Sequence, residues 1–98
     1  MKPIVELFRL ESSIQQLKAK GQYELALQYF DQIIQIKQNL PNRLGLARTV
    51  VEKAYLLEQL GFRQDALQNY QYAWQLAENT IHTDLLQNIA DRIGMLGR

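Results

Sequence analysis

The sequence predicts an all-α fold of five helices, and three observations support this class. Apolar residues recur at spacings of three and four along five segments, which is the period of a helix with one buried face. No segment has the alternating pattern or β-branched run typical of a strand. Finally, the segment Gly21–Phe30 resembles the segment Gly61–Tyr70, 40 residues later, almost position by position. A period of this length indicates a helical unit that is repeated along the chain.

The first two helices are expected at about residues 4–19 and 23–38. Pro3 suits the first turn of a helix, where its missing N–H is not needed. Gly21 ends the first helix, because glycine readily adopts the left-handed conformation found just after helices. The turn residues 39–42 end the second. The apolar faces consist of Ile4, Leu7, Phe8, Leu10, Ile14 and Leu17 in the first helix, and of Tyr23, Ala26, Leu27, Phe30, Ile33 and Ile34 in the second.

The third and fourth helices are expected at about 43–59 and 63–78, with Gly61 between them, and the fifth at 81–94. The connections are short, so neighbouring helices should be antiparallel and form hairpins. Asn79 and Thr80 are suitable N-cap residues for the fifth helix. The apolar residues are Leu46, Val50, Ala54, Leu57 and Leu60, then Ala66, Leu67, Tyr70, Ala73, Trp74 and Ala77, and finally Ile81, Leu85, Leu86, Ile89 and Ile93.

The repeated hairpin resembles the tetratricopeptide repeat. In that family the second helix carries an alanine four residues before an aromatic, as in Ala26-x-x-x-Phe30 and Ala66-x-x-x-Tyr70. The period of 40 rather than 34 residues resembles the longer variant found in kinesin light chains and many bacterial regulators. The family's first-helix tryptophan and Leu-Gly pair are replaced here by other residues. The resemblance implies one domain over 1–98, a right-handed α-α superhelix with repeats at 4–38 and 43–78 and a capping helix at 81–94.

The resemblance also implies where a partner binds, because the first helices of such repeats line a concave groove. The candidate groove residues are Phe8, Glu11, Gln15 and Lys18 in the first helix, and Arg48, Val51, Glu52, Tyr55 and Glu58 in the third. The cations are too few to hold an acidic C-terminus as chaperone-binding members of the family do, so a peptide ligand of mixed or basic character is expected. The alternative interpretation is an ordinary solvated face.

The two ends of the chain differ in pattern. Four polar residues of the fifth helix stand where a following repeat would need an apolar face. The opposite stripe of this helix is apolar. The fifth helix is therefore expected to pack back on the third and fourth helices and to cap the stack. The four are Asp84, Gln87, Asn88 and Asp91. Near the N-terminus, Val5 and Phe8 are expected to leave exposed apolar surface, which favours self-association as an alternative.

Composition narrows the function further. The chain has 98 residues, 47% hydrophobic and 21% charged, with a net charge of +1 and scattered cations, which argues against a nucleic-acid or membrane partner. It has no cysteine and one isolated histidine, His82, so no metal, cofactor or catalytic site is expected. We expect a cytoplasmic, non-enzymatic adaptor or assembly factor that binds a peptide or helix in a shallow groove. The alternative is a structural, homodimeric helical-repeat unit.

Overall fold

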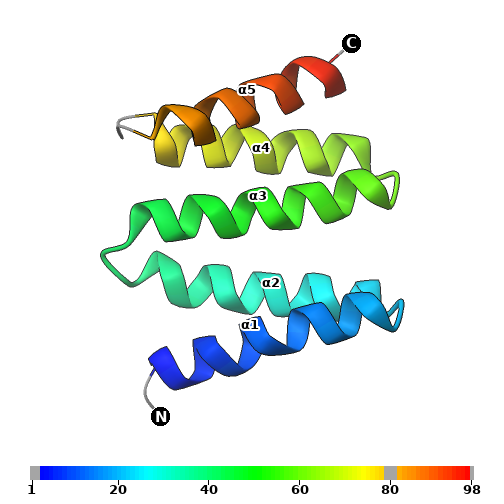
Figure 1. The fold of residues 1–98 in the computed structure, drawn as a ribbon, viewed down its shortest axis with the longest axis vertical. Helices are drawn as coiled ribbons and strands as arrows, with labels where there is room; N and C mark the ends of the chain where they lie inside the picture. Colours follow the sequence, from blue (N-terminus) through cyan, green and yellow to red (C-terminus); the bar gives the residue numbers. More distant parts are fainter. Residues whose placement is uncertain (1–2, 79–81, 98) are drawn as a thin grey trace. The chain divides into compact units, whose positions relative to one another are not determined.

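The computed structural model describes residues 3–78 and 82–97 and contains five α-helices in these ranges (Figure 1). They are α1 (Pro3–Ala19), α2 (Tyr23–Gln38), α3 (Arg43–Gln59), α4 (Arg63–Ala77) and α5 (Thr83–Leu96). No strand occurs among the described residues. The all-α prediction is therefore confirmed, and the expected bounds of the first four helices agree with the structure to within one residue.

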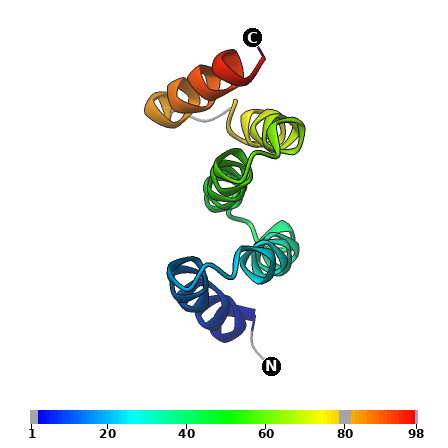
Figure 2. The same ribbon diagram turned by 90° about the vertical axis from the view of Figure 1, so that its right-hand side faces the viewer.

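The chain divides into two compact units, Met1–Pro41 and Asn42–Arg98. In the first unit, α1 packs against α2. In the second, α3 packs against α4 and α4 against α5 (Figure 1). Figure 2 shows α3 and α4 nearly end-on, with α5 beside α4. Successive helices within each unit are thus antiparallel neighbours, as their short connections predict.

The two hairpin turns have the same backbone geometry. Gly21 and Gly61 adopt φ values of 75° and 89°, in the left-handed region that side-chain-bearing residues avoid. The N–H groups of Gln22 and Phe62 donate to the carbonyl oxygens of the residues five positions earlier, each at 2.9 Å. Together with the glycine N–H bonds, this is the Schellman arrangement, which satisfies carbonyls at the end of a helix.

The cores also correspond at a spacing of 40 residues. Ala26 and Ala66 are completely buried, and the aromatic rings of Phe30 and Tyr70 are buried one turn further along α2 and α4. The buried apolar residues are Leu7, Leu10, Ile14, Ala26, Phe30 and Ile33 in the first unit, and Leu46, Ala47, Val50, Ala54, Leu56, Leu57, Ala66, Tyr70, Ala73, Leu76, Ala77 and Ile89 in the second. An alanine beside an aromatic lets two helices approach closely while the ring fills the remaining space.

The apolar face predicted for α1 was wrong at Ile4, which is 74% exposed. Phe8 was assigned to the same face and is also 74% exposed, which agrees instead with the exposed apolar surface expected at Val5 and Phe8. At 3.6 residues per turn, Phe8 lies about 160° around the helix from the buried Leu10. The spacing rule accepted Phe8 because it is four residues from Ile4, but neither side chain lies on the face that packs against α2.

The fifth helix begins and ends later than expected. His82 is its N-cap residue, and the helix continues through Gly94 to Leu96. The predicted caps Asn79 and Thr80 and the predicted first residue, Ile81, lie outside the described residues.

Arg63 gives a physical reason for the extension of α5. It lies at the start of α4, and its Nε and Nη2 donate to the carbonyl oxygens of Leu96 and Met95, at 3.0 and 3.4 Å. Arg43, at the start of α3, contacts the end of α4 in the same way. A cation there satisfies terminal carbonyls and complements the helix dipole.

Opposite stability effects are expected for two Gly→Ala substitutions. Gly61→Ala should destabilise the protein by about 1–2 kcal/mol, because alanine is strained in the left-handed region. Gly94→Ala should stabilise it by up to about 1 kcal/mol, because Gly94 is inside a helix and an added Cβ meets no atom within 4 Å. Urea denaturation followed by circular dichroism measures both. Gly21→Ala alters the equivalent residue of the other turn and should cause the same kind of loss. A neutral Gly61→Ala would contradict the argument.

Candidate functional site

The candidate residues on α1 form an open helical face. Phe8, Glu11 and Gln15 are exposed, and Lys18 is half-buried. The carboxylate of Glu11 accepts a hydrogen bond from Nζ of Lys37 on α2, at 3.4 Å. These side chains therefore present one apolar ring among polar groups, on a surface accessible to a partner.

The candidate residues on α3 differ in exposure along the helix. Arg48 and Glu52 are exposed, whereas Val51 and Glu58 are half-buried. Tyr55 is 41% exposed. Tyr55 and Glu58 are three positions apart, so their side chains lie on adjacent turns of the same face.

Two residues from other helices complete a polar cluster around Tyr55 and Glu58. The buried Oη of Tyr70, on α4, donates to Oε1 of Glu58 at 2.9 Å. Arg92, on α5, places Nη1 3.5 Å from Oε2 of the same carboxylate. The guanidinium carbon of Arg92 lies 5.1 Å from the centre of the Tyr55 ring, a cation–π distance. We call these four residues the Tyr55–Glu58–Tyr70–Arg92 cluster.

The hydrogen bond between Tyr70 and Glu58 is the anchored part of this cluster. The Tyr70 side chain is completely buried, so its hydroxyl needs an acceptor inside the protein. Burial raises the pKa of Tyr70, and the hydrogen bond and charge of Glu58 raise that pKa further. The hydroxyl therefore stays protonated at neutral pH and holds Oε1 of Glu58 in place.

The contacts of Arg92 are weaker. Its side chain is 31% exposed and that of Glu58 is 21% exposed, so water screens the ion pair. Such pairs contribute about 0–1 kcal/mol. A cation–π contact at a partly exposed site adds about 0.5–1 kcal/mol. Arg92 is therefore held by interactions that a competing group can replace.

Sequence reasoning found the α3 half of this cluster and missed the other half. Tyr70 was expected in the core, and its ring is there, but the need of its hydroxyl for an acceptor was not used. On α5, Arg92 lies at the border between the apolar and polar stripes, three residues after the buried Ile89. A long cation one turn from a core residue was the signal that could have found it.

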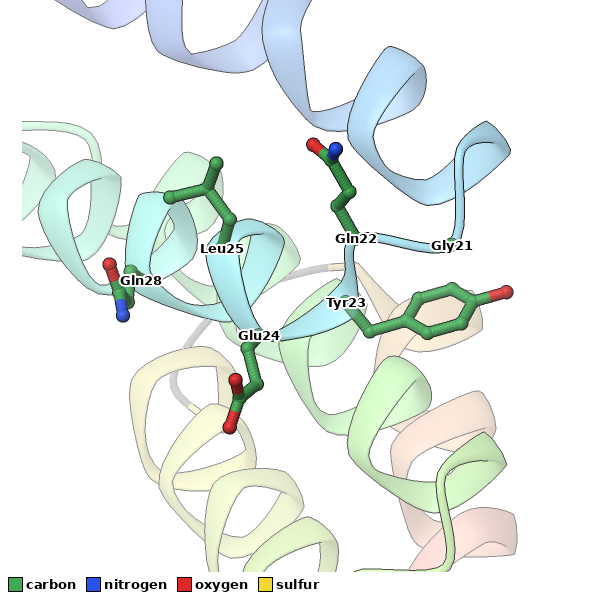
Figure 3. Close-up of a pocket in the computed structure, with 6 residues that line it drawn as sticks. All are labelled: Gly21, Gln22, Tyr23, Glu24, Leu25 and Gln28. Atoms are coloured by element: carbon green, nitrogen blue, oxygen red, sulfur yellow. The ribbon is translucent and has the colours of Figure 1, made fainter.

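Surface hollows lie near these elements in the described part of the chain. One of about 540 Å³ borders the turn between α1 and α2 and is lined by Gly21, Gln22, Tyr23, Glu24, Leu25 and Gln28. Figure 3 shows that its side chains fan out in different directions instead of converging. A second, of about 420 Å³, is lined by Glu58, Gly61, Arg63, Met95 and Leu96. A third, of about 300 Å³, is lined by Trp74, Ala90, Ile93 and Gly94.

The expectations for the end of the chain can also be compared with the structure. The polar stripe of α5, from Asp84 to Asp91, is exposed, and Ile89 on the apolar stripe is completely buried. His82 is exposed. Among the described residues, no group of three His, Asp or Glu side chains could hold a metal ion. Within the same ranges, no helix is long and apolar enough to cross a bilayer.

The fold and the cluster define an all-α domain of sequentially packed antiparallel helices with a polar cluster at the surface of its second unit. No protein-family model matches the chain. Comparisons with curated proteins and with solved structures find no match either.

The Tyr70 hydroxyl makes stability depend on pH in the alkaline range. Well below pH 10, the usual pKa of tyrosine, Tyr70 is protonated in both the folded and the unfolded state. Above it, the unfolded chain loses a proton that the folded protein keeps, so the free energy of unfolding falls as pH rises. Tyr70→Phe should remove the contribution of this hydroxyl to the alkaline decrease in the free energy of unfolding. The same substitution should lower the free energy of unfolding at neutral pH by about 1 kcal/mol. Urea denaturation at several pH values measures both effects. Tyr23→Phe is the exposed control, and an identical fall in Tyr70→Phe would contradict the assignment.

Proposed function

We propose that this chain is a non-catalytic protein-interaction module, an adaptor or assembly factor, that binds a peptide or helix of another protein. The exposed faces of α1 and α3 supply the contacts. The observation that carries this proposal is that each face exposes an aromatic side chain, Phe8 on α1 and Tyr55 on α3, among polar groups. Aromatic residues surrounded by polar ones are typical anchors of protein interfaces.

The finer architectural proposal is a tetratricopeptide-like arrangement of two repeats and a capping helix. Its support is the correspondence between the hairpins: helices that begin 40 residues apart, glycine turns with the same hydrogen bonds, and buried alanine–aromatic pairs. The capping role of α5 is supported by its exposed polar stripe opposite Ile89. In this architecture, the first helices of the repeats carry the ligand.

The charges on the two faces favour a ligand of mixed or basic character. Glu11 and Glu52 are exposed acids, and Arg48 is the exposed cation of the proposed set. Glu58 contributes a further carboxylate that Arg92 partly neutralises. The cations of the proposed set are Arg48 and the half-buried Lys18, too few to hold a peptide that ends in a cluster of acids, so such a peptide is not the ligand that these faces fit.

Variants of α3 test the proposal. Peptides are selected on the wild-type protein from a display library of random short sequences, and each is then measured by titration against Tyr55→Ala and Arg48→Glu. We expect at least a tenfold loss of affinity in Tyr55→Ala, the size expected when an aromatic anchor is truncated. Phe62→Ala is the matched control, because Phe62 is an exposed aromatic at the start of α4, outside the proposed faces. Equal losses in Tyr55→Ala and Phe62→Ala, or none in either, would refute the assignment of the α3 face.

A second candidate function is self-association through the start of α1. Ile4, Val5 and Phe8 are all exposed and lie within about one turn of each other. Exposed apolar surface of this kind marks interfaces. Glu6 and Arg9, which form an ion pair within the helix, border this apolar patch. A two-fold dimer with antiparallel α1 helices would bring the apolar patches of two copies together, with these charged pairs at the rim.

The molar mass in solution tests this second candidate. Light scattering after size exclusion, over a range of protein concentrations, should give the mass of a dimer for the wild type and of a monomer for Phe8→Glu, because a charge cannot be buried unpaired at the dimer interface. Phe62→Glu places the same charge at another exposed aromatic and should leave the dimer intact. A wild-type monomer at every concentration would exclude this function.

A further inference from the structure

We propose that Tyr55 and Glu58 form a receptor for a guanidinium group, which Arg92 of the same chain occupies, and that an arginine side chain of the partner replaces Arg92 there. This inference rests on the proposed function, since it names the ligand chemistry that the α3 face recognises. Its physical basis is the Tyr55–Glu58–Tyr70–Arg92 cluster.

The receptor is built by the α3–α4 hairpin alone. Tyr55 offers the face of an aromatic ring and Glu58, on the next turn of α3, offers a carboxylate; these are the two groups that guanidinium ions bind best. Tyr70 donates to Oε1 of Glu58, which leaves Oε2 directed to the group above the Tyr55 ring. Because none of these three residues belongs to α5, the receptor keeps its parts when Arg92 leaves.

The way in which Arg92 occupies the receptor leaves room for competition. One nitrogen, Nη1, approaches Oε2 at 3.5 Å, so the pairing is a single long contact instead of the shorter, two-point contact that arginine makes with a well-placed carboxylate. A hollow of about 420 Å³, lined by Glu58 together with Gly61, Arg63, Met95 and Leu96, lies on another side of Glu58 and leaves this residue open to solvent there. An arginine on a partner, unlike Arg92, is free to adjust its approach and make the second hydrogen bond.

α5 does not have to detach when Arg92 is displaced. Ile89 is completely buried, and Arg63 holds the carbonyl oxygens of Met95 and Leu96 at the end of the helix. These attachments lie about one turn on either side of residue 92. The exchange is therefore a movement of one side chain, and Arg92 lowers the affinity for the partner's arginine without blocking it.

Chemical rescue tests the receptor without any partner protein. Arg92→Ala removes the occupant, and ethylguanidinium at roughly tens of millimolar should then raise the melting temperature of this variant but not that of the wild type. Ethylammonium at the same ionic strength is the control, because it carries the charge without the planar group, and its effect should be clearly smaller. The rescue should disappear in the Arg92→Ala/Glu58→Gln double variant. Equal effects of the two cations, or rescue that persists without Glu58, would overturn the proposal.

A peptide titration followed by nuclear magnetic resonance tests the competition. A capped Gly-Arg-Gly peptide should bind Arg92→Ala about tenfold more tightly than the wild type, and should shift the Tyr55 ring signals. The same peptide with neutral citrulline in place of arginine should lose this binding. Arg92→Lys is the second variant should Arg92→Ala fail to fold; it keeps the charge of residue 92 but not its flat contact with Tyr55, so it should also bind the arginine peptide more tightly than the wild type.

The opposite ligand chemistry is also measured. A Gly-Glu-Gly peptide that binds the wild type better than the arginine peptide would overturn the proposal and assign Arg92 itself as the receptor for an acid.

The rescue experiment also separates this inference from the proposed function. Rescue with no Tyr55-dependent peptide in the display library leaves the receptor standing and rejects the interaction module. Library peptides that need Tyr55 but contain no arginine, together with failed rescue, reject the guanidinium receptor and leave the interaction module standing.

Discussion

The buried contact between a small residue and an aromatic ring is the constraint on which the rest of this structure depends. Ala26 and Ala66 have no exposed surface, and each is followed one turn later by a buried ring, Phe30 or Tyr70. Because alanine lets neighbouring helices approach, the ring can fill the space between them. The glycine turns then hold the helices at that distance, since the left-handed residue and its two hydrogen bonds fix the direction in which the chain reverses.

The Tyr55–Glu58–Tyr70–Arg92 cluster depends on a difference between the two cores. Phe30 in the first unit corresponds to Tyr70 in the second, and the added hydroxyl is buried, where it must find an acceptor. Glu58 supplies it, whereas the corresponding residue in the first unit, 40 positions earlier, is Lys18. Phenylalanine needs no acceptor, so lysine is compatible there. The carboxylate that faces Tyr55 and Arg92 is thus oriented from within the core, and an interior requirement determines a surface property.

Sequence reasoning located the first four helices well because their ends are encoded locally, by Gly21, Gly61 and the turn at residues 39–42. The end of α5 was not predictable in this way, because Arg63 from another helix satisfies its terminal carbonyls and the helix passes through Gly94. Of the four residues in the cluster, Tyr55 and Glu58 were among the predicted site residues, whereas Tyr70 and Arg92 were not. Their contributions depend on how α4 and α5 are rotated about their axes against α3, which apolar spacing does not determine.

Two kinds of contact, apolar packing and the polar contacts of Arg92, join α5 to the other helices of its unit, and they differ in strength. Burying a side chain such as Ile89 contributes about 1.5–3 kcal/mol, and this contribution is lost only if the helix leaves. The contacts of Arg92 are exposed to water, and each contributes about 1 kcal/mol or less. A helix anchored by the first kind of contact can release a side chain held by the second. Ile89 and Arg92 lie within one turn of the same helix. The packing of Ile89 therefore holds α5 in place at the point where the weaker contacts of Arg92 can be exchanged.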